Sequence, residues 1–324
     1  MKTTLDYENE LIKSFIHYGV EIKDIEKKPK TNSYLFTADN KKLCIKKVYA
    51  KDNVIVTNYE LQQNIKDIPE LYIEKIEKTL TDDTFLKIND ITYVTFNSID
   101  SIELDFNIKE DAFLFFKTLQ LKEKLFENMH LENEIFTHLI ENRPLDLDIS
   151  KNNDIIKQLH KNVQNQKKKS DFDFSFLKYF SQISETLLET ESFLENNEFY
   201  KNRTYNIILN STYIENFKGT PTIKTPYTFC YGSKYVDIYN FLYRYIKKTN
   251  TENLIPFDEL ISSYMKNMCE DEKKLIKYLL QYPFKYINIM VQYYDKKRNF
   301  VPREILFDLE EQKILNEKIN NFIN

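Results

Sequence analysis

Cysteine and histidine, the residue types that most often hold metals or serve as nucleophiles and bases, are few and scattered in this chain. The cysteines are Cys44, Cys230 and Cys269, and they form no CxxC pair and no spacing that would hold zinc. The histidines are His17, His130, His138 and His160, and no cysteine or acid completes a metal set around them. No Ser-His-acid arrangement follows from the spacing. We therefore predict no metal site and three reduced thiols.

Glycine, which builds the loops that cradle phosphate groups, is nearly absent. The 324 residues include only Gly19, Gly219 and Gly232, so neither a GxGxxG nor a GxxxxGK[ST] loop can form. A nucleotide bound by this chain would therefore be held in another way.

The composition is that of a globular protein, with 42% hydrophobic and 30% charged residues. The net charge of −4 gives no electrostatic basis for binding nucleic acid. The first residues lack the apolar core of a signal peptide, and no run approaches the roughly 18 apolar residues that a membrane span needs. We expect synthesis in the cytoplasm, no nucleic-acid partner and no membrane span.

The first hundred residues alternate with the period of two that is typical of strands, interrupted by one helix. The predicted strands are Tyr34–Thr37, Leu43–Val48, Leu71–Lys78, Phe85–Ile88 and Ile91–Phe96, and the helix is Asp52–Ile65. A further strand is expected around Ile22 and Ile25. This region predicts a mostly antiparallel sheet with one inserted helix.

After Asn97 the spacing of apolar residues becomes helical. The predicted helices are Lys109–Met129, Ser175–Asn196, Tyr235–Lys248, Phe257–Met268, Asp271–Tyr282 and Phe284–Tyr294, with a last one that begins at Pro302. The polar stretch Arg143–Ser170 is expected to be partly helix and partly an exposed connection, and Ile207–Lys224 breaks the rhythm with short apolar runs. We predict an α+β protein with two domains, residues 1–98 and residues 99–324.

Three stretches of the chain carry a family resemblance. The first runs from YGVE at residues 18–21 to LCIKK at residues 43–47, and the second is SDFD at 170–173 followed by FLKYF at 176–180. The third is LLQYPFKY at 279–286, with QYY at 292–294 and FVP at 300–302. Together they resemble the CotS-like spore coat proteins, whose fold is that of aminoglycoside phosphotransferases and choline kinases. The resemblance implies a bilobal protein-kinase-like fold, with a small antiparallel sheet lobe and a larger helical lobe.

The resemblance also implies a position for a nucleotide. In active members of this fold a strand lysine contacts the phosphates and is held by a glutamate. Lys46 matches that lysine, and Glu60 on the following helix is the expected partner, whereas Glu74 comes too late and on a strand. We expect Lys46 and Glu60 to be a vestigial nucleotide-binding pair. The alternative is that Lys46 is an edge-strand lysine in water.

The catalytic loop of such folds reads HxDxxxxN, and the best match here is LNSTYIEN at residues 209–216. In this match Leu209 replaces the histidine, Ser211 replaces the aspartate and only Asn216 is retained. A serine hydroxyl is not basic enough near neutral pH to accept the proton of an attacking hydroxyl. The acid that would hold magnesium should fall near Thr225–Tyr227, where the sequence has none.

Because two required acids are missing together, we expect a non-catalytic, pseudokinase-like protein without a cofactor or metal. The resemblance implies a structural or assembly component of the bacterial endospore coat. It would be made in the cytoplasm of the mother cell and assembled into the coat. Its expected partners are other spore coat proteins. The 23 tyrosines and 24 phenylalanines would also allow self-association through aromatic contacts.

Two other interpretations remain open. The chain would be an active ATP-dependent small-molecule phosphotransferase if a displaced residue supplied the catalytic acid, and Glu215 and Asp237 are the candidates. Asp237 is also interpreted as a structural acid at the start of a helix. Alternatively, the chain would bind a nucleotide or a sugar as a structural ligand without turning it over.

Overall fold

The computed structural model describes residues 11–13, 15–18, 23–28, 33–38, 41–126, 149–202, 205–209, 213–224, 229–264, 268–295 and 302–323. Contacts group the chain into two compact units. The first contains Met1–Asp105, Glu110–Pro144 and Ile207–Tyr231, and the second contains Phe106–Lys109, Leu145–Asn206 and Gly232–Asn324. The single boundary predicted between residues 98 and 99 differs from this division, because segments beyond residue 98 pair with strands before it.

The larger sheet of the first unit is antiparallel, with the strand order β1-β2-β3-β7-β5 and with β6 also paired to β7. Its strands are β1 (Lys23–Lys28), β2 (Ser33–Ala38), β3 (Lys41–Val48), β5 (Ile76–Glu77), β6 (Leu86–Ile88) and β7 (Ile91–Asn97), preceded by the 3-10 turn η1 (Phe15–Tyr18). Asn89 and Asp90 join β6 to β7 with φ values of 51° and 62°. Positive φ at both residues is what a two-residue hairpin of type I′ requires, and Asn and Asp tolerate it.

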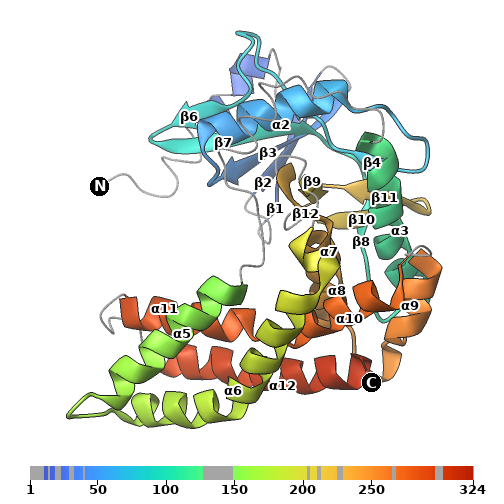
Figure 1. Ribbon diagram of the computed structural model, residues 1–324. Helices are drawn as coiled ribbons and strands as arrows, with labels where there is room; N and C mark the ends of the chain where they lie inside the picture. Colours follow the sequence, from blue (N-terminus) through green and yellow to red (C-terminus); the bar gives the residue numbers. More distant parts are fainter. Residues whose placement is uncertain are drawn as a thin grey trace. The chain divides into compact units, whose positions relative to one another are not determined.

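The alternation of side chains along β3 divides the core of this sheet into two clusters. Leu43 and Ile45 belong to the cluster on one face, with Tyr34 and Phe36 of β2. Val48 belongs to the cluster on the other face. That second cluster consists of Val48, Ile55, Ile76, Val94 and Phe96. Ile55 comes from α2 (Asp52–Asn64), which therefore covers this face, as Figure 1 shows.

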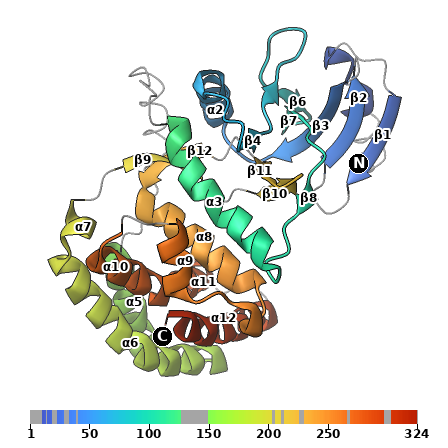
Figure 2. The same ribbon diagram turned by 90° about the vertical axis from the view of Figure 1, so that its right-hand side faces the viewer.

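A smaller sheet joins segments that are far apart in the sequence. Its order is β4-β11-β10-β8, and the strands are β4 (Tyr72–Ile73), β8 (Ile102–Glu103), β10 (Ile214–Phe217) and β11 (Thr220–Ile223). β10 and β11 form an antiparallel hairpin, whereas β11 and β4 are parallel. The helix α3 (Lys109–Phe126) lies beside β10 in both views (Figures 1 and 2). A separate pair is formed by β9 (Tyr205–Leu209) and β12 (Phe229–Ser233).

The second unit is mainly helical in its described part. Its helices are α5 (Ile149–Gln164), α6 (Asp171–Asn196), α7 (Glu198–Lys201), α8 (Lys234–Lys248), α9 (Phe257–Tyr264), α10 (Glu270–Gln281), α11 (Phe284–Asp295) and α12 (Pro302–Ile323), with the 3-10 turn η4 (Thr251–Asn253). α5 packs on α6 and α11, and α12 packs on α8, α10 and α11. Large aromatic side chains fill the interior, and Tyr245, Tyr286, Phe176 and Phe257 are fully buried.

Two of the stretches that carry the family resemblance pack against each other. Ser170 caps α6: its hydroxyl accepts from the Asp173 N–H, and the Asp173 carboxylate accepts from the Ser170 N–H. The Tyr294 hydroxyl donates to the other Asp173 oxygen at 2.9 Å. The rings of Phe172 and Tyr293 have centroids 4.1 Å apart. The SDFD and QYY motifs are therefore accounted for by the packing of α6 against α11.

The α+β fold class and most of the predicted elements are confirmed, with two differences. The predicted strand Leu71–Lys78 is two short strands, because β4 pairs in the smaller sheet and β5 in the larger one. The irregular stretch Ile207–Lys224 contains most of β9 and the β10–β11 hairpin. None of the helices in the described part combines the length and the apolar character that crossing a membrane demands.

Candidate functional site

The register of the smaller sheet brings Glu74, Lys224 and Glu215 to one face. β11 and β4 run parallel with Thr222 beside Tyr72, so Lys224 and Glu74, two residues further on, are neighbours. Glu215 lies opposite Thr222 in the β10–β11 hairpin. Since side chains alternate, Lys224 is on the same face as Thr222 and therefore as Glu215. A pairing between strands about 150 residues apart thus places a lysine between two carboxylates.

Lys46 reaches the same place from β3 of the larger sheet. It lies opposite Val94 of β7, on the face that α2 covers. Its Nζ donates to the backbone carbonyl of Lys224 at 3.0 Å and lies 3.6 Å from Oε2 of Glu74. The same ammonium lies over the Phe96 ring, 5.3 Å from its centroid. Lys46 is therefore held in place by an ion pair, a carbonyl and an aromatic face.

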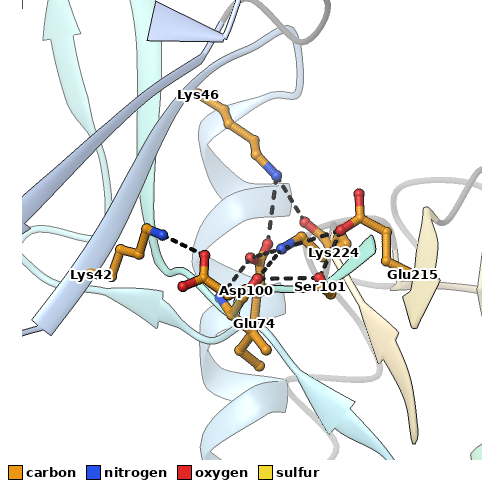
Figure 3. A network of polar contacts seen from close by, with 8 residues as sticks. Lys42, Lys46, Glu74, Asp100, Ser101, Glu215 and Lys224 are labelled. Atoms are coloured by element: carbon orange, nitrogen blue, oxygen red, sulfur yellow. Dashed lines mark hydrogen bonds and ion pairs between the residues drawn. The ribbon is translucent and has the colours of Figure 1, made fainter. Parts of the chain in front are cut away.

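The Lys224 ammonium lies at the centre of these contacts (Figure 3). Its Nζ is 2.5 Å from Oε1 of Glu74 and 3.6 Å from Oε2 of Glu215, and it donates to the Ile99 carbonyl at 2.8 Å. The Ser101 hydroxyl donates to the same Glu215 oxygen at 2.7 Å. We refer to Lys46, Glu74, Ser101, Glu215 and Lys224 as the polar network.

Burial makes the charges of the polar network strongly dependent on one another. The Glu74 side chain is 0% exposed, and those of Lys46 and Lys224 are 14% and 13% exposed. Glu215 is more open, with 26% of its side chain exposed. A carboxylate removed from water is stable only when it is paired. Two lysines and two glutamates give the network a formal charge of zero.

Two neighbours of Lys46 on β3 lie outside the polar network. Lys42 forms an ion pair with Asp100, and both side chains are exposed. Cys44 is buried, and burial is the main cause that raises the pKa of its thiol. A thiol with a raised pKa stays protonated near neutral pH and is a poor nucleophile. Neither residue adds reactive chemistry to the network.

The prediction that Glu60 is the partner of Lys46 is wrong. The carboxylate that contacts Lys46 belongs to Glu74, the residue that the sequence argument passes over. The buried side of α2 carries Ile55, Asn58 and Gln62 at helical spacing. Glu60 lies about 200° around the helix from Asn58, and its side chain is exposed. The ion pair therefore comes from the end of β4.

Only part of the predicted catalytic loop lies among the described residues. Leu209 is the last residue of β9 and is buried. Ser211 and the stretch Thr225–Tyr227 lie outside the described residues. The expected loss of both acids therefore stays a prediction from the sequence.

Asn216, the one retained residue of that loop, lies within β10. Its Oδ1 accepts from the Gly219 N–H at 2.8 Å, and its Nδ2 donates to Asp111 of α3 at 3.3 Å. Gly219 has a φ of +83°, which suits the turn that Asn216 closes. The side chain is thus engaged in the hairpin turn and in fixing α3 to the sheet.

The two acids proposed as displaced replacements lie in different environments. Asp237 is 0% exposed in the first turn of α8, after the capping residue Ser233. A buried acid at a helix N-terminus stabilises the helix and is out of reach of a substrate. Glu215 is partly exposed and belongs to the polar network. Only Glu215 of these two can meet a bound molecule.

The residues that the sequence argument misses are Glu74, Lys224 and Ser101. Glu74 and Lys224 each directly follow an isoleucine at the end of a short strand, in LYIEKI and PTIKT. A charge at a core-facing strand position must find a partner of opposite charge, and this is the signal that could have found them. Ser101 has no such signal, since nothing in its surrounding sequence marks it.

The described part of the second unit has an open cavity of about 810 Å³ between α6, α7 and α10. Phe193 and Tyr278 stack in it with centroids 4.2 Å apart. Glu189, Glu198 and Asp271 also line it, without a lysine or arginine among the described lining residues. Carboxylates repel phosphate groups, so this cavity does not suit the phosphates of a nucleotide.

No protein-family model matches the chain, and no curated protein matches it in sequence. Solved structures match it over nearly its whole length. An aminoglycoside phosphotransferase from Alicyclobacillus acidocaldarius has a TM-score of 0.72 at 11% identity, over 95% of this chain and 92% of that one. A spectinomycin phosphotransferase has a TM-score of 0.63 at 13% identity, over 97% of both chains. A choline kinase from Streptococcus pneumoniae has a TM-score of 0.50 at 12% identity, over 97% of this chain and 99% of that one.

These comparisons correct the expectation that the chain is not an enzyme. The structures that it resembles are those of phosphotransferases and kinases, and no described residue shows that their activity has been lost. The identities lie far below the level at which a shared substrate would follow. What the likeness establishes is architecture: the chain has the protein-kinase-like fold of aminoglycoside phosphotransferases and choline kinases.

Proposed function

We propose that this chain is a nucleoside-triphosphate-dependent phosphotransferase that acts on a hydroxyl group of a small molecule. The observation that carries the proposal is the ion pair of Lys46 with the fully buried Glu74, in a chain with the fold of small-molecule kinases. In such folds a lysine on this strand, held by a glutamate from a helix, contacts nucleotide phosphates, and here Glu74 supplies the carboxylate from the end of β4.

The polar network fits this task electrostatically. Lys46 is held at 3.6 Å from Glu74 and keeps part of its surface accessible, so its ammonium can contact a phosphate oxygen without losing its partner. Lys224 offsets the charge of Glu74 and Glu215, which would otherwise repel a triphosphate. Positioning and charge stabilisation supply most of the catalysis of phosphoryl transfer.

Glu215 is the residue proposed to accept a proton. In the transfer step, the oxygen of the substrate hydroxyl forms a bond to the γ-phosphorus, and the bond from that phosphorus to the bridging oxygen breaks. The nucleoside diphosphate leaves with that electron pair, and the hydroxyl proton goes to the Glu215 carboxylate. The Ser101 hydroxyl, 2.7 Å from Oε2, orients this carboxylate.

Binding and turnover of ATP test the proposal separately. We expect ATP to raise the melting temperature of the native chain, and Lys46→Met to abolish this shift. Lys47→Met is the matched control, because Lys47 is the next residue on β3 and points to the opposite face. An unchanged shift in Lys46→Met, or none in the native chain, would refute the role of Lys46.

Transfer is measured with radiolabelled ATP and a panel of hydroxyl-bearing acceptors that includes choline and spectinomycin. We expect Glu215→Gln to retain ATP binding and to lose at least about 100-fold in turnover, the usual contribution of a general base. Glu110→Gln removes an exposed carboxylate of the same unit and serves as control. Equal turnover in both variants would rule out Glu215 as the proton acceptor.

The spore coat is a separate part of the proposal, supported by the three sequence stretches and by no structural comparison. We propose assembly into the coat of an endospore, with other coat proteins as partners. A fluorescent fusion expressed in a sporulating bacterium should move from the mother-cell cytoplasm to the surface of the forespore. A fusion that stays diffuse while a known coat protein assembles would refute this location.

A further inference from the structure

The surroundings of the Lys224 ammonium are those of a bound cation. Three oxygens from three segments converge on Nζ: a Glu74 carboxylate oxygen at 2.5 Å, the Ile99 carbonyl at 2.8 Å and a Glu215 carboxylate oxygen at 3.6 Å. Carboxylate and carbonyl oxygens are the ligands that magnesium and calcium take in proteins. We refer to these three oxygens as the oxygen cage, which the side chain of Lys224 itself fills.

The described residues do not fit a protein-held magnesium ion, which phosphoryl transfer on this fold implies. No three His, Cys, Asp or Glu side chains in the described part of the chain come close enough together to hold a metal. The two carboxylates that do converge, Glu74 and Glu215, already share one ammonium. A divalent ion added between them would be repelled by the Lys224 ammonium that already lies there.

We infer that the Lys224 ammonium takes the place of a protein-held divalent ion in the polar network. With Lys224, the network is neutral, and a phosphate group meets Lys46 without repulsion from Glu74 and Glu215. Without Lys224, one lysine faces two carboxylates, and the formal charge of the network becomes −1. Lys224 is thus a positioning residue that acts through the two carboxylates. The inference rests on the proposed function only where it names a nucleotide as the ligand.

The first experiment measures the affinity of the native chain for ATP by calorimetry, once with magnesium and once with excess EDTA. We expect the two dissociation constants to differ by less than about tenfold. Binding that is weakened about tenfold or more by EDTA would overturn the inference while leaving the proposed function intact. In Lys224→Gln, whose side chain is shorter and uncharged, EDTA should weaken binding by about tenfold or more. If EDTA weakens ATP binding to Lys224→Gln no more than it weakens ATP binding to the native chain, the inference is overturned.

The second experiment needs no nucleotide. Lys224→Ala empties the oxygen cage, and the variant should bind one Mn²⁺ ion, counted by electron paramagnetic resonance, whereas the native chain should bind none there. Lys218→Ala is the matched control, since Lys218 lies exposed in the turn of the same hairpin. A folded Lys224→Ala variant that binds no more Mn²⁺ than the control would overturn the inference.

The two experiments separate the two ideas. If ATP binds the native chain under neither condition, the proposed function fails, and the Mn²⁺ count alone decides whether Lys224 fills a cation site. If Lys224→Ala does not fold, the same count is made on Lys224→Gln, which likewise places no ammonium in the oxygen cage. Gain of one Mn²⁺ ion supports the inference, and no gain overturns it.

Discussion

Glu74→Gln should strongly destabilise the first unit, because it removes the carboxylate that contacts the ammonium groups of both Lys46 and Lys224. Glu74 is 0% exposed, contacts Lys46 and Lys224 and also accepts from the Ile99 N–H. Breaking a buried pair from one side costs about 3–5 kcal/mol, because the remaining charge stays buried without compensation. Lys46 loses its ion-pair partner here, whereas Lys224 keeps the more distant Glu215 carboxylate, so we expect a cost within that range.

Urea unfolding followed by circular dichroism measures this cost. With a slope of about 3 kcal/mol per molar urea, a loss of about 3–5 kcal/mol lowers the midpoint by about 1–1.7 M. Glu60→Gln is the matched control, since the Glu60 side chain is exposed on α2 and should change stability by less than about 0.5 kcal/mol. Adding Lys46→Met to Glu74→Gln should recover part of the loss.

Equal midpoints for Glu74→Gln and Glu60→Gln would refute the electrostatic reasoning. A large loss in Glu60→Gln alone would instead restore the pairing expected from the sequence. The double variant distinguishes charge from packing, because a packing defect would add to the first loss instead of reversing it.

Three further predictions concern the fold. Ser170→Ala removes the hydroxyl that accepts from the Asp173 N–H and should lower the free energy of unfolding, measured in urea, by about 1 kcal/mol. An unchanged free energy of unfolding would show that the cap does not stabilise α6. Gly219→Ala should lower the free energy of unfolding by about 1 kcal/mol and the melting temperature by about 2–4 °C. The added carbon has no atom within 4 Å, so the cost comes from backbone strain at a φ of +83°. An unchanged melting temperature would contradict this strain. Burial is the main cause that raises the pKa of Tyr18 and of Tyr243 to about 12, above the ordinary value of 10. Their contribution to stability is therefore complete below pH 10 and is lost as the pH rises from about 10 to about 12, because the unfolded chain ionises first. Unfolding curves across this range check the loss, and tyrosinate absorbance that titrates entirely near pH 10 would contradict it.

Elements with local signals could be predicted from the sequence. The β2–β3 hairpin, α2 and the start of α12 at Pro302 follow from strand alternation, helical spacing and a proline suited to a first turn. The protein-kinase-like fold was reached through the family resemblance and is confirmed at the level of fold by the structural comparisons. Lys46 is on β3 as expected, since the alternation along that strand is regular.

The partner of Lys46 could not be predicted, because it depends on contacts between distant segments. The chain changes sheets between Ile73 and Ile76, and no local period marks a strand that pairs with two different sheets. The order of the elements along the chain suggests Glu60, because α2 directly follows β3. The core around Ile55 sets how α2 is rotated about its axis, and this rotation turns Glu60 outward.

Sequence by itself determined that Lys46 lies on a strand, because residue type and local period are both visible in it, but it did not single out Glu74 or Lys224. Only the tertiary structure decided that the two meet, through the parallel pairing of β4 with β11. The physical reason is that a strand's period tells which face a side chain occupies but not which distant strand will lie beside it. Which strands pair depends on the apolar surface that the whole sheet buries.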